Sequence, residues 1–166
     1  HQWHHFDHSR PDPYHWLRDD TRKDPKILAA LKAENQYLDD HLAHTKALQD
    51  DLFKEMVGRI KKDDSSVPFE IEGYWYWTRF EGKSEYPILC RKKGSLEGPD
   101  ELVEDVLNCN VLASGQTFFD LGEWDSTDDQ RYIAYSTDTV GRRRYILQIL
   151  DTETHECLSD RIEDVS

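Results

Sequence analysis

The spacing of apolar residues between positions 24 and 60 follows the period of an α-helix. Asp24 is a suitable N-cap, and Pro25 suits the first helical position, where a missing N–H costs nothing. One apolar stripe then extends to about His44, interrupted by Asn35, at Leu28, Leu31, Leu38 and Leu42. A second helix is predicted from Thr45, a candidate cap, with an apolar side formed by Leu48, Leu52, Phe53, Met56, Val57 and Ile60. The short link between the two favours an antiparallel helical pair.

The helical period stops at "KKDDSSVP", residues 61–68, where charge, serine and proline interrupt the chain. Beyond this break, short runs with the alternation of β-strands are separated by turn residues. The predicted strands are 69–71, 74–80, 86–91, 102–106, 118–124, 132–136, 145–150 and 156–158. Only the stretch 106–114 among them has a helical pattern. Strands at this spacing favour an antiparallel β architecture over βαβ units.

A weak internal repeat favours one antiparallel architecture, the β-propeller. The segments "EGYWYWTRFEGKSEYPILCRKKG" and "DQRYIAYSTDTVGRRRYILQILDTETHE" each contain a strand, a turn with glycine, a second strand and a polar turn. Two such units fit the roughly 40–50-residue period of propeller blades. Two units do not close a ring, so the predicted fold is an α-helical pair followed by the antiparallel blades of an incomplete β-propeller.

The first repeat carries aromatic residues on both faces of its strand. Alternation places Tyr74, Tyr76 and Phe80 on one face and Trp75 and Trp77 on the other. A platform for stacking nucleic-acid bases would need its aromatic residues on one exposed face. We therefore interpret this strand as packed between two layers.

Net charge argues against a nucleic-acid partner. The chain has 21 Lys and Arg against 34 Asp and Glu, a net charge of −13, whereas a nucleic-acid binder needs a cationic surface. No segment is apolar enough to cross a bilayer, so no membrane partner is expected. The cysteines Cys90, Cys109 and Cys157 form no C-x-x-C pair and are interpreted as reduced thiols of a cytoplasmic protein.

Several candidate motifs fail on their spacing. The Gly-Lys-Ser at 82–84 has Trp77 where a phosphate loop needs glycine, so Gly82 is interpreted as the tight turn of a hairpin, with Lys83 and Ser84 facing solvent. The acidic run 123–130 lacks the order of a calcium loop and is predicted to be a solvated turn.

Other candidate residues lack the context that their chemistry needs. The N-terminal His1, His4, His5 and His8 are interpreted as part of a flexible or surface-bound leader rather than a metal site. No G-x-S-x-G elbow or nucleophile–base pair occurs. We therefore assign no catalytic, cofactor-binding or metal-binding residue, and no cofactor.

The segments "PDPYHWLRDDTRKDPKILAALKAENQYLDDHL" and "MVGRIKKDDSSVP" resemble the N-terminal signature of the prolyl oligopeptidase family of serine peptidases, most closely its oligopeptidase B branch. The resemblance implies a seven-bladed β-propeller joined to an α/β-hydrolase domain with a Ser-Asp-His triad, which would lie beyond this chain. Two turns depart from the family pattern: the usual "SPDGRYIAYS" appears here as "STDDQRYIAYS", residues 126–136, and His155 stands where glycine is usual.

The resemblance implies a division into a leader (1–23), a helical segment that packs on the hydrolase domain (24–62) and the start of the propeller, about two blades (63–166). It also implies that the complete protein cleaves short basic peptides after Lys or Arg, with the propeller excluding folded substrates. Residues 1–166 alone would then be inactive. Two alternatives stay open: a non-catalytic β-rich interaction module, and a proline-specific oligopeptidase of the same family.

Overall fold

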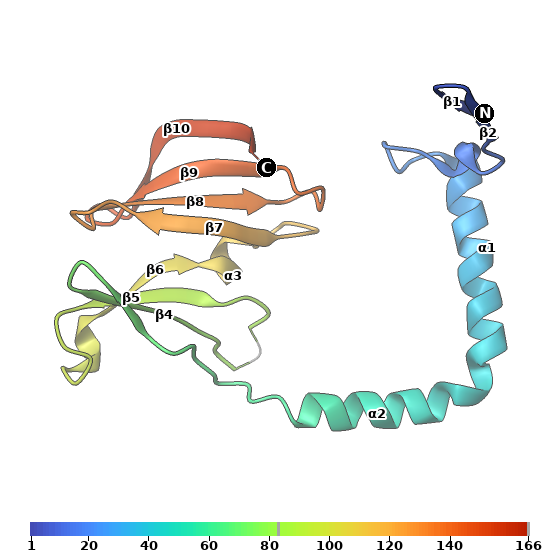
Figure 1. The fold of residues 1–166 in the computed structure, drawn as a ribbon. Helices are drawn as coiled ribbons and strands as arrows, with labels where there is room; N and C mark the ends of the chain where they lie inside the picture. The colour runs from blue at the N-terminus through green and yellow to red at the C-terminus, as the bar shows by residue number, and fades with distance from the viewer. Residues whose placement is uncertain (83, 166) are drawn as a thin grey trace. The chain divides into compact units, whose positions relative to one another are not determined.

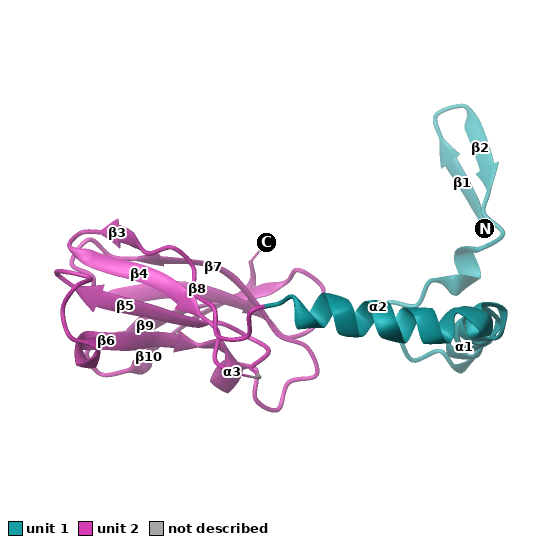
Figure 2. Ribbon diagram, turned by 90° about the horizontal axis from the view of Figure 1, so that it is seen from below, with its two compact units in different colours: residues 1–60 teal, residues 61–166 magenta. Residues whose placement is uncertain are grey.

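The computed structural model describes residues 1–82 and 84–165, which fall into two compact units, residues 1–60 and 61–166 (Figure 2). Lys83, expected to face solvent, lies outside the described residues. Within the described part of the chain, none of the helices combines the length and the apolar character needed to span a membrane.

The first unit begins with a short hairpin that the sequence pattern did not predict. Strands β1 (Gln2–His5) and β2 (His8–Pro11) pair in antiparallel register, with Phe6 at a φ of 52° in the two-residue turn. The Trp3 indole N–H donates to the Asp12 carboxylate at 3.1 Å. The segment 1–23, predicted to be a leader, therefore contains local structure, which continues into the 3₁₀ helix η1 (His15–Leu17).

Two helices follow, and the prediction of a helical pair is confirmed. Helix α1 (Pro25–Leu42) begins as expected, because the Asp24 carboxylate accepts the backbone N–H groups of Lys26 and Ile27. A 3₁₀ turn, η2 (Ala43–Thr45), leads to α2 (Lys46–Gly58). The predicted capping role of Thr45 is wrong, since its hydroxyl donates back to the Leu42 carbonyl at 2.8 Å and caps no N–H group of α2.

The expected antiparallel packing of the two helices is also wrong. Helices α1 and α2 run in different directions from η2 and do not lie along each other (Figure 1). Their apolar stripes are therefore left open: Phe53 is 69% exposed and Met56 is 65% exposed. Only Ile27 of the two helices is buried.

The second unit contains two four-stranded antiparallel sheets, the antiparallel blades predicted from the repeat (Figure 1). Each sheet is ordered along the chain, as expected for consecutive hairpins. The first consists of β3 (Phe69–Ile71), β4 (Tyr74–Arg79), β5 (Ile88–Lys93) and β6 (Val103–Asn108). The second consists of β7 (Asp120–Ser126), β8 (Tyr132–Asp138), β9 (Tyr145–Asp151) and β10 (Glu156–Val165).

Connections differ from the predictions more than strands do. The helical stretch expected at 106–114 shrinks to α3 (Cys109–Leu112), because Val106 to Asn108 complete β6. A 3₁₀ turn, η3 (Asp100–Leu102), precedes β6. Gly82 has the positive φ expected of a turn, 56°, but it lies in an eight-residue connection, 80–87, rather than in a tight hairpin.

The core of the second unit lies between the inner faces of the two sheets. It is formed by Tyr76, Leu89, Val106, Leu107, Ile133, Tyr135 and Leu150. Tyr76 is 0% exposed, and its ring centroid lies 5.1 Å from that of Trp124 in the other sheet. Trp75 and Trp77, on the opposite face of β4, are only half-buried. Phe80, predicted on the Tyr76 face, is 39% exposed. The prediction of two covered faces is therefore fulfilled at Tyr76 and only in part elsewhere on both faces.

Candidate functional site at the junction of the two sheets

The junction between the sheets is centred on Gln130, a buried residue in the turn before β8. Its side-chain oxygen accepts the Tyr76 hydroxyl at 2.8 Å, and its amide nitrogen donates to the Thr127 carbonyl at 2.9 Å. Its own backbone carbonyl accepts Arg91 Nη1 at 2.6 Å and the Thr152 hydroxyl at 3.3 Å. Gln130 thus joins β4 and β5 of the first sheet to two turns of the second sheet, residues 127–131 and 152–155.

Arg91 is the charged member of this junction. Its side chain is 5% exposed, and its Nε lies 2.7 Å from the Glu104 carboxylate. The guanidinium also sits 4.7 Å from the centre of the Tyr74 ring. Burial by itself lowers the pKa of Arg91, but the hydrogen bonds and charge interactions with Glu104 and Tyr76 together outweigh it, and the pKa is raised. Arg91 therefore remains a permanent cation facing the Gln130 carbonyl.

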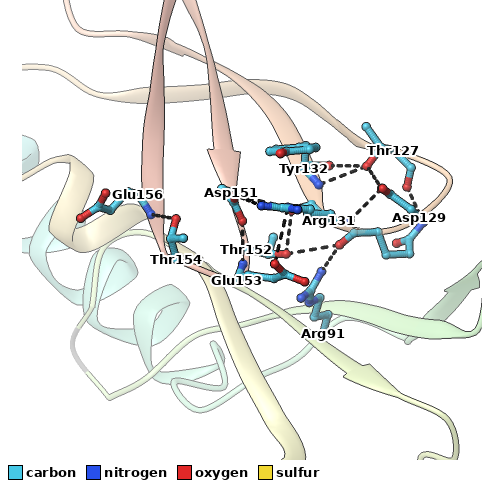
Figure 3. A network of polar contacts seen from close by, with 11 residues as sticks. Arg91, Thr127, Asp129, Arg131, Tyr132, Asp151, Thr152, Glu153, Thr154 and Glu156 are labelled. Carbon is cyan, nitrogen blue, oxygen red and sulfur yellow. Dashed lines mark hydrogen bonds and ion pairs between the residues drawn. The ribbon is translucent and has the colours of Figure 1, made fainter.

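Arg131 forms a second ion pair, with Asp151 (Figure 3). Both its Nε and its Nη2 donate to Asp151 Oδ2, at 3.3 and 3.0 Å. The hydrogen bond from Arg131 lowers the pKa of Asp151 below its ordinary value. The Thr152 hydroxyl meanwhile donates to the Arg131 carbonyl at 2.7 Å. The turn 152–155 is thereby tied to the turn 127–131.

The two departures from the family turn pattern keep the backbone conformation of glycine. Gln130 has a φ of 62° and His155 a φ of 57°, both in the left-handed region. Gln130 is buried and hydrogen-bonded through its side chain, whereas His155 is exposed. The substitution at 130 therefore adds a bridge between the sheets, which glycine could not provide.

The junction brings together charged and hydrogen-bonding groups from the two sheets. Among the residues that the structure describes, no hydroxyl or thiol hydrogen-bonds to a histidine side chain. Burial raises the pKa of the Cys90 and Cys109 thiols to about 11, so neither is an activated nucleophile. The Cys90 Sγ instead accepts a hydrogen bond from Arg79 at 2.9 Å.

The other motifs examined in the sequence are dispersed. His5 and His8 face each other across the β1–β2 hairpin, while His1 stacks on His15 with ring centroids 4.0 Å apart. Within the described ranges, no three potential metal ligands come together. The acidic run 123–130, predicted to be a solvated turn, begins as the end of β7 and ends at the buried Gln130. The prediction therefore holds only for 127–129, where Asp129 accepts the Thr127 hydroxyl at 2.5 Å.

The junction has only a weak signal in the amino-acid sequence. Gln130 stands out as a departure from the turn pattern, but its partners Tyr76 and Arg91 are 54 and 39 residues away. Neither partner can be identified from the sequence, because the contacts depend on how the two sheets face each other.

Comparison with known proteins decides the family. Residues 1–166, the whole chain, match the family described as "Prolyl oligopeptidase, N-terminal beta-propeller domain". The chain belongs to the prolyl oligopeptidase family. The two sheets of residues 61–166 are accordingly blades of its N-terminal β-propeller.

Members of the prolyl oligopeptidase family among the relatives are peptidases. The chain is 39% identical to "Dipeptidyl aminopeptidase BI" of Pseudoxanthomonas mexicana, over 92% of this chain and 23% of that protein. It is 29% identical to "Protease 2" of Moraxella lacunata, over 94% of this chain and 23% of that protein. The solved structure of oligopeptidase B from Leishmania major superposes with a TM-score of 0.84 at 30% identity, over 94% of this chain and 22% of that one. The chain therefore spans less than a quarter of the length of these relatives.

Proposed function

We propose that this propeller segment is the N-terminal part of a serine oligopeptidase that cleaves short peptides after Lys or Arg. The observation that carries the proposal is the likeness to oligopeptidase B from Leishmania major, which covers both the helices and the blades. The catalytic Ser-Asp-His triad belongs, in this proposal, to a C-terminal hydrolase domain of the same protein. Residues 1–166 alone are then inactive.

The exposed helix faces support a role for the helical segment 24–62 in docking that domain. Leu31, Phe53 and Met56 carry apolar side chains that are at least half-exposed. Surfaces of this kind are normally covered by another part of the protein. The blades then form one wall of the chamber and exclude folded substrates. Reduced, buried thiols at Cys90 and Cys109 are consistent with the cytoplasmic location that we include in the proposal.

The experiment is a comparison of substrates on the complete protein encoded by the gene. Fluorogenic peptides blocked at the N-terminus, with Arg, Lys or Pro before the reporter group, separate the branches of the family. We expect turnover after Arg and Lys to exceed turnover after Pro by at least tenfold, and a serine-directed phosphonate to abolish it. Preferential cleavage after Pro, or the absence of any phosphonate-sensitive activity, would contradict the proposal.

A second candidate is a dipeptidyl aminopeptidase, favoured by the 39% identity to the Pseudoxanthomonas mexicana protein. Such an enzyme requires a free N-terminal amine two residues before the cleaved bond. Matched Arg-containing dipeptide reporters with free and blocked N-termini distinguish the two activities. Turnover of only the free form would support the second candidate and contradict the first.

A further inference from the structure

The loop between β8 and β9, residues 139–144, carries three consecutive arginines, Arg142, Arg143 and Arg144, all exposed. They stand out because the chain has a net charge of −13. The stretch after Ser66 contains only 10 Lys and Arg against 21 Asp and Glu. Three of those ten cations therefore lie side by side in one loop.

A buried carboxylate fixes the backbone of this loop. Asp138, at the end of β8, is 2% exposed. Its Oδ1 accepts the N–H groups of Val140 and Gly141 at 2.7 and 3.0 Å. Its Oδ2 accepts those of Arg142 and Arg143 at 2.8 and 2.7 Å. Four hydrogen bonds to one side chain hold the arginines on an ordered backbone, which lowers the entropy lost when they bind a ligand.

The loop lies at the end of the blades where the chain enters the propeller. The Asp64 carbonyl accepts the Phe80 N–H at 2.8 Å, so the entering segment 61–66 runs beside the end of β4. The connection that follows β4 contacts Phe119 through Tyr86, with ring centroids 5.2 Å apart. The neighbouring ring of Phe118 lies against Gly141 of the arginine loop. The β4–β5 and β8–β9 connections therefore lie at the same end of the two blades (Figure 1).

The side chains suit a carboxylate ligand. A guanidinium presents paired N–H groups that match the two oxygens of a carboxylate. Arg144 already has one such partner, Asp164, at 3.7 Å on an exposed surface. Among the described residues, none forms an ion pair with the Arg143 side chain, which leaves its N–H groups to solvent or a ligand.

We propose that the arginine loop 139–144 binds the free C-terminal carboxylate of the peptide substrate, with Arg143 as the principal contact. This inference rests on the proposed peptidase function and adds a substrate feature to it. In a short peptide, the terminal carboxylate lies only a few residues beyond the cleaved bond. An Arg143 held at a fixed distance from the cleaved bond would favour peptides of limited length, because the carboxylate of a longer peptide would lie beyond its reach.

The test uses the complete protein and one short peptide with a single Arg cleavage site, made with either a free acid or an amide at its C-terminus. In the double variant Arg143→Gln, Arg144→Gln, we expect kcat/KM for the acid to fall about tenfold, the size of one charge-assisted hydrogen bond. The value for the amide should change less than twofold. The preference of the unmodified protein for the acid should also weaken as salt is added.

The matched control is Arg161→Gln, which removes an exposed arginine that pairs with Glu163 on β10. This variant should leave kcat/KM unchanged for both the acid and the amide. An equal fall in kcat/KM for the acid and the amide in the double variant would indicate a contact between domains and would overturn the inference. An unchanged kcat/KM for both peptides would also overturn it. If the unmodified protein cleaves neither peptide, the proposed peptidase function itself fails. Activity on the amide therefore tests the peptidase function separately from the carboxylate contact.

Discussion

The helical unit and the sheet unit contain apolar residues in similar abundance but use them differently. In residues 61–166, aromatic and aliphatic side chains from two sheets meet in one core, with Tyr76 and Ile133 fully buried. In residues 1–60, the stripes on α1 and α2 meet nothing comparable, and Phe53 remains 69% exposed. A regular apolar stripe therefore predicts a helix without predicting what covers it. The two sheets cover each other's inner faces, whereas the two helices leave each other's apolar stripes uncovered.

The largest expected effect comes from emptying the core of the sheet unit. Ile133→Ala should lower the free energy of unfolding by about 2–5 kcal/mol, because the side chain is 0% exposed and its removal leaves a cavity between the blades. Urea unfolding of residues 1–166, followed by tryptophan fluorescence, measures the change. Val140→Ala, at a 60% exposed position in the same unit, is the control and should cost less than about 0.5 kcal/mol. A similar cost at both positions would contradict a core confined to the inner faces.

A smaller effect is expected from the polar junction within that core. Tyr76→Phe removes the hydroxyl that donates to Gln130 and leaves a buried amide oxygen without that partner. We expect a loss of about 1–3 kcal/mol in unfolding free energy. Tyr37→Phe, on an exposed position of α1, should be neutral in the same assay. If Tyr76→Phe were neutral as well, the hydrogen bond would contribute nothing to the junction.

The two left-handed turn residues should respond differently to glycine. His155→Gly should stabilise the protein by up to about 1 kcal/mol, because it relieves the left-handed conformation at an exposed site. Gln130→Gly gains the same relief but loses the bond from Tyr76, so it should be neutral or destabilising. Thermal unfolding of the two variants side by side measures the difference. Stabilisation of equal size by both would show that the Gln130 side chain bridges nothing.

The smallest effect on the stability of residues 1–166 is expected from helix α2, and it tests the difference between the two units directly. Phe53→Ala should change the unfolding free energy of residues 1–166 by less than about 0.5 kcal/mol, because the ring is mostly in water. In the complete protein the same variant should cost at least about 1.5 kcal/mol, since the proposed hydrolase domain would cover the ring. Equal small costs in both would mean that this helix face stays uncovered.

Sequence periodicity predicted the elements well where burial follows it. The alternation at 74–80 and 132–136 identified β4 and β8, because one face of each packs into a core. It missed the His-rich hairpin 2–11, whose residues are exposed, and it ended β10 at 158 because the charged continuation to Val165 lies at an open edge. Alternation of apolar and polar residues arises where one face of a strand is covered. Strands without a covered face therefore show little alternation.

The tertiary arrangement was harder to predict for a different reason. A short link favours antiparallel helix packing, but link length alone does not specify a contact, and the apolar faces of α1 and α2 stay exposed. The Gln130 junction and the arginine loop depend on residues brought together from different strands. In the sequence, Asp138 is one of many acidic residues. Its role becomes evident only from the four backbone N–H groups that it accepts in the structure.

Gln130 also determines how unfolding spreads from one blade to the next. In a repeat architecture, stability is the sum of what each repeat contributes alone and what each interface between neighbours contributes. The bonds from Tyr76 and Arg91 to Gln130 belong entirely to the interface contribution. A strong interface relative to the repeats makes neighbouring repeats melt together. The first two blades should therefore open as one cooperative block, which keeps the entry end of the propeller from fraying strand by strand.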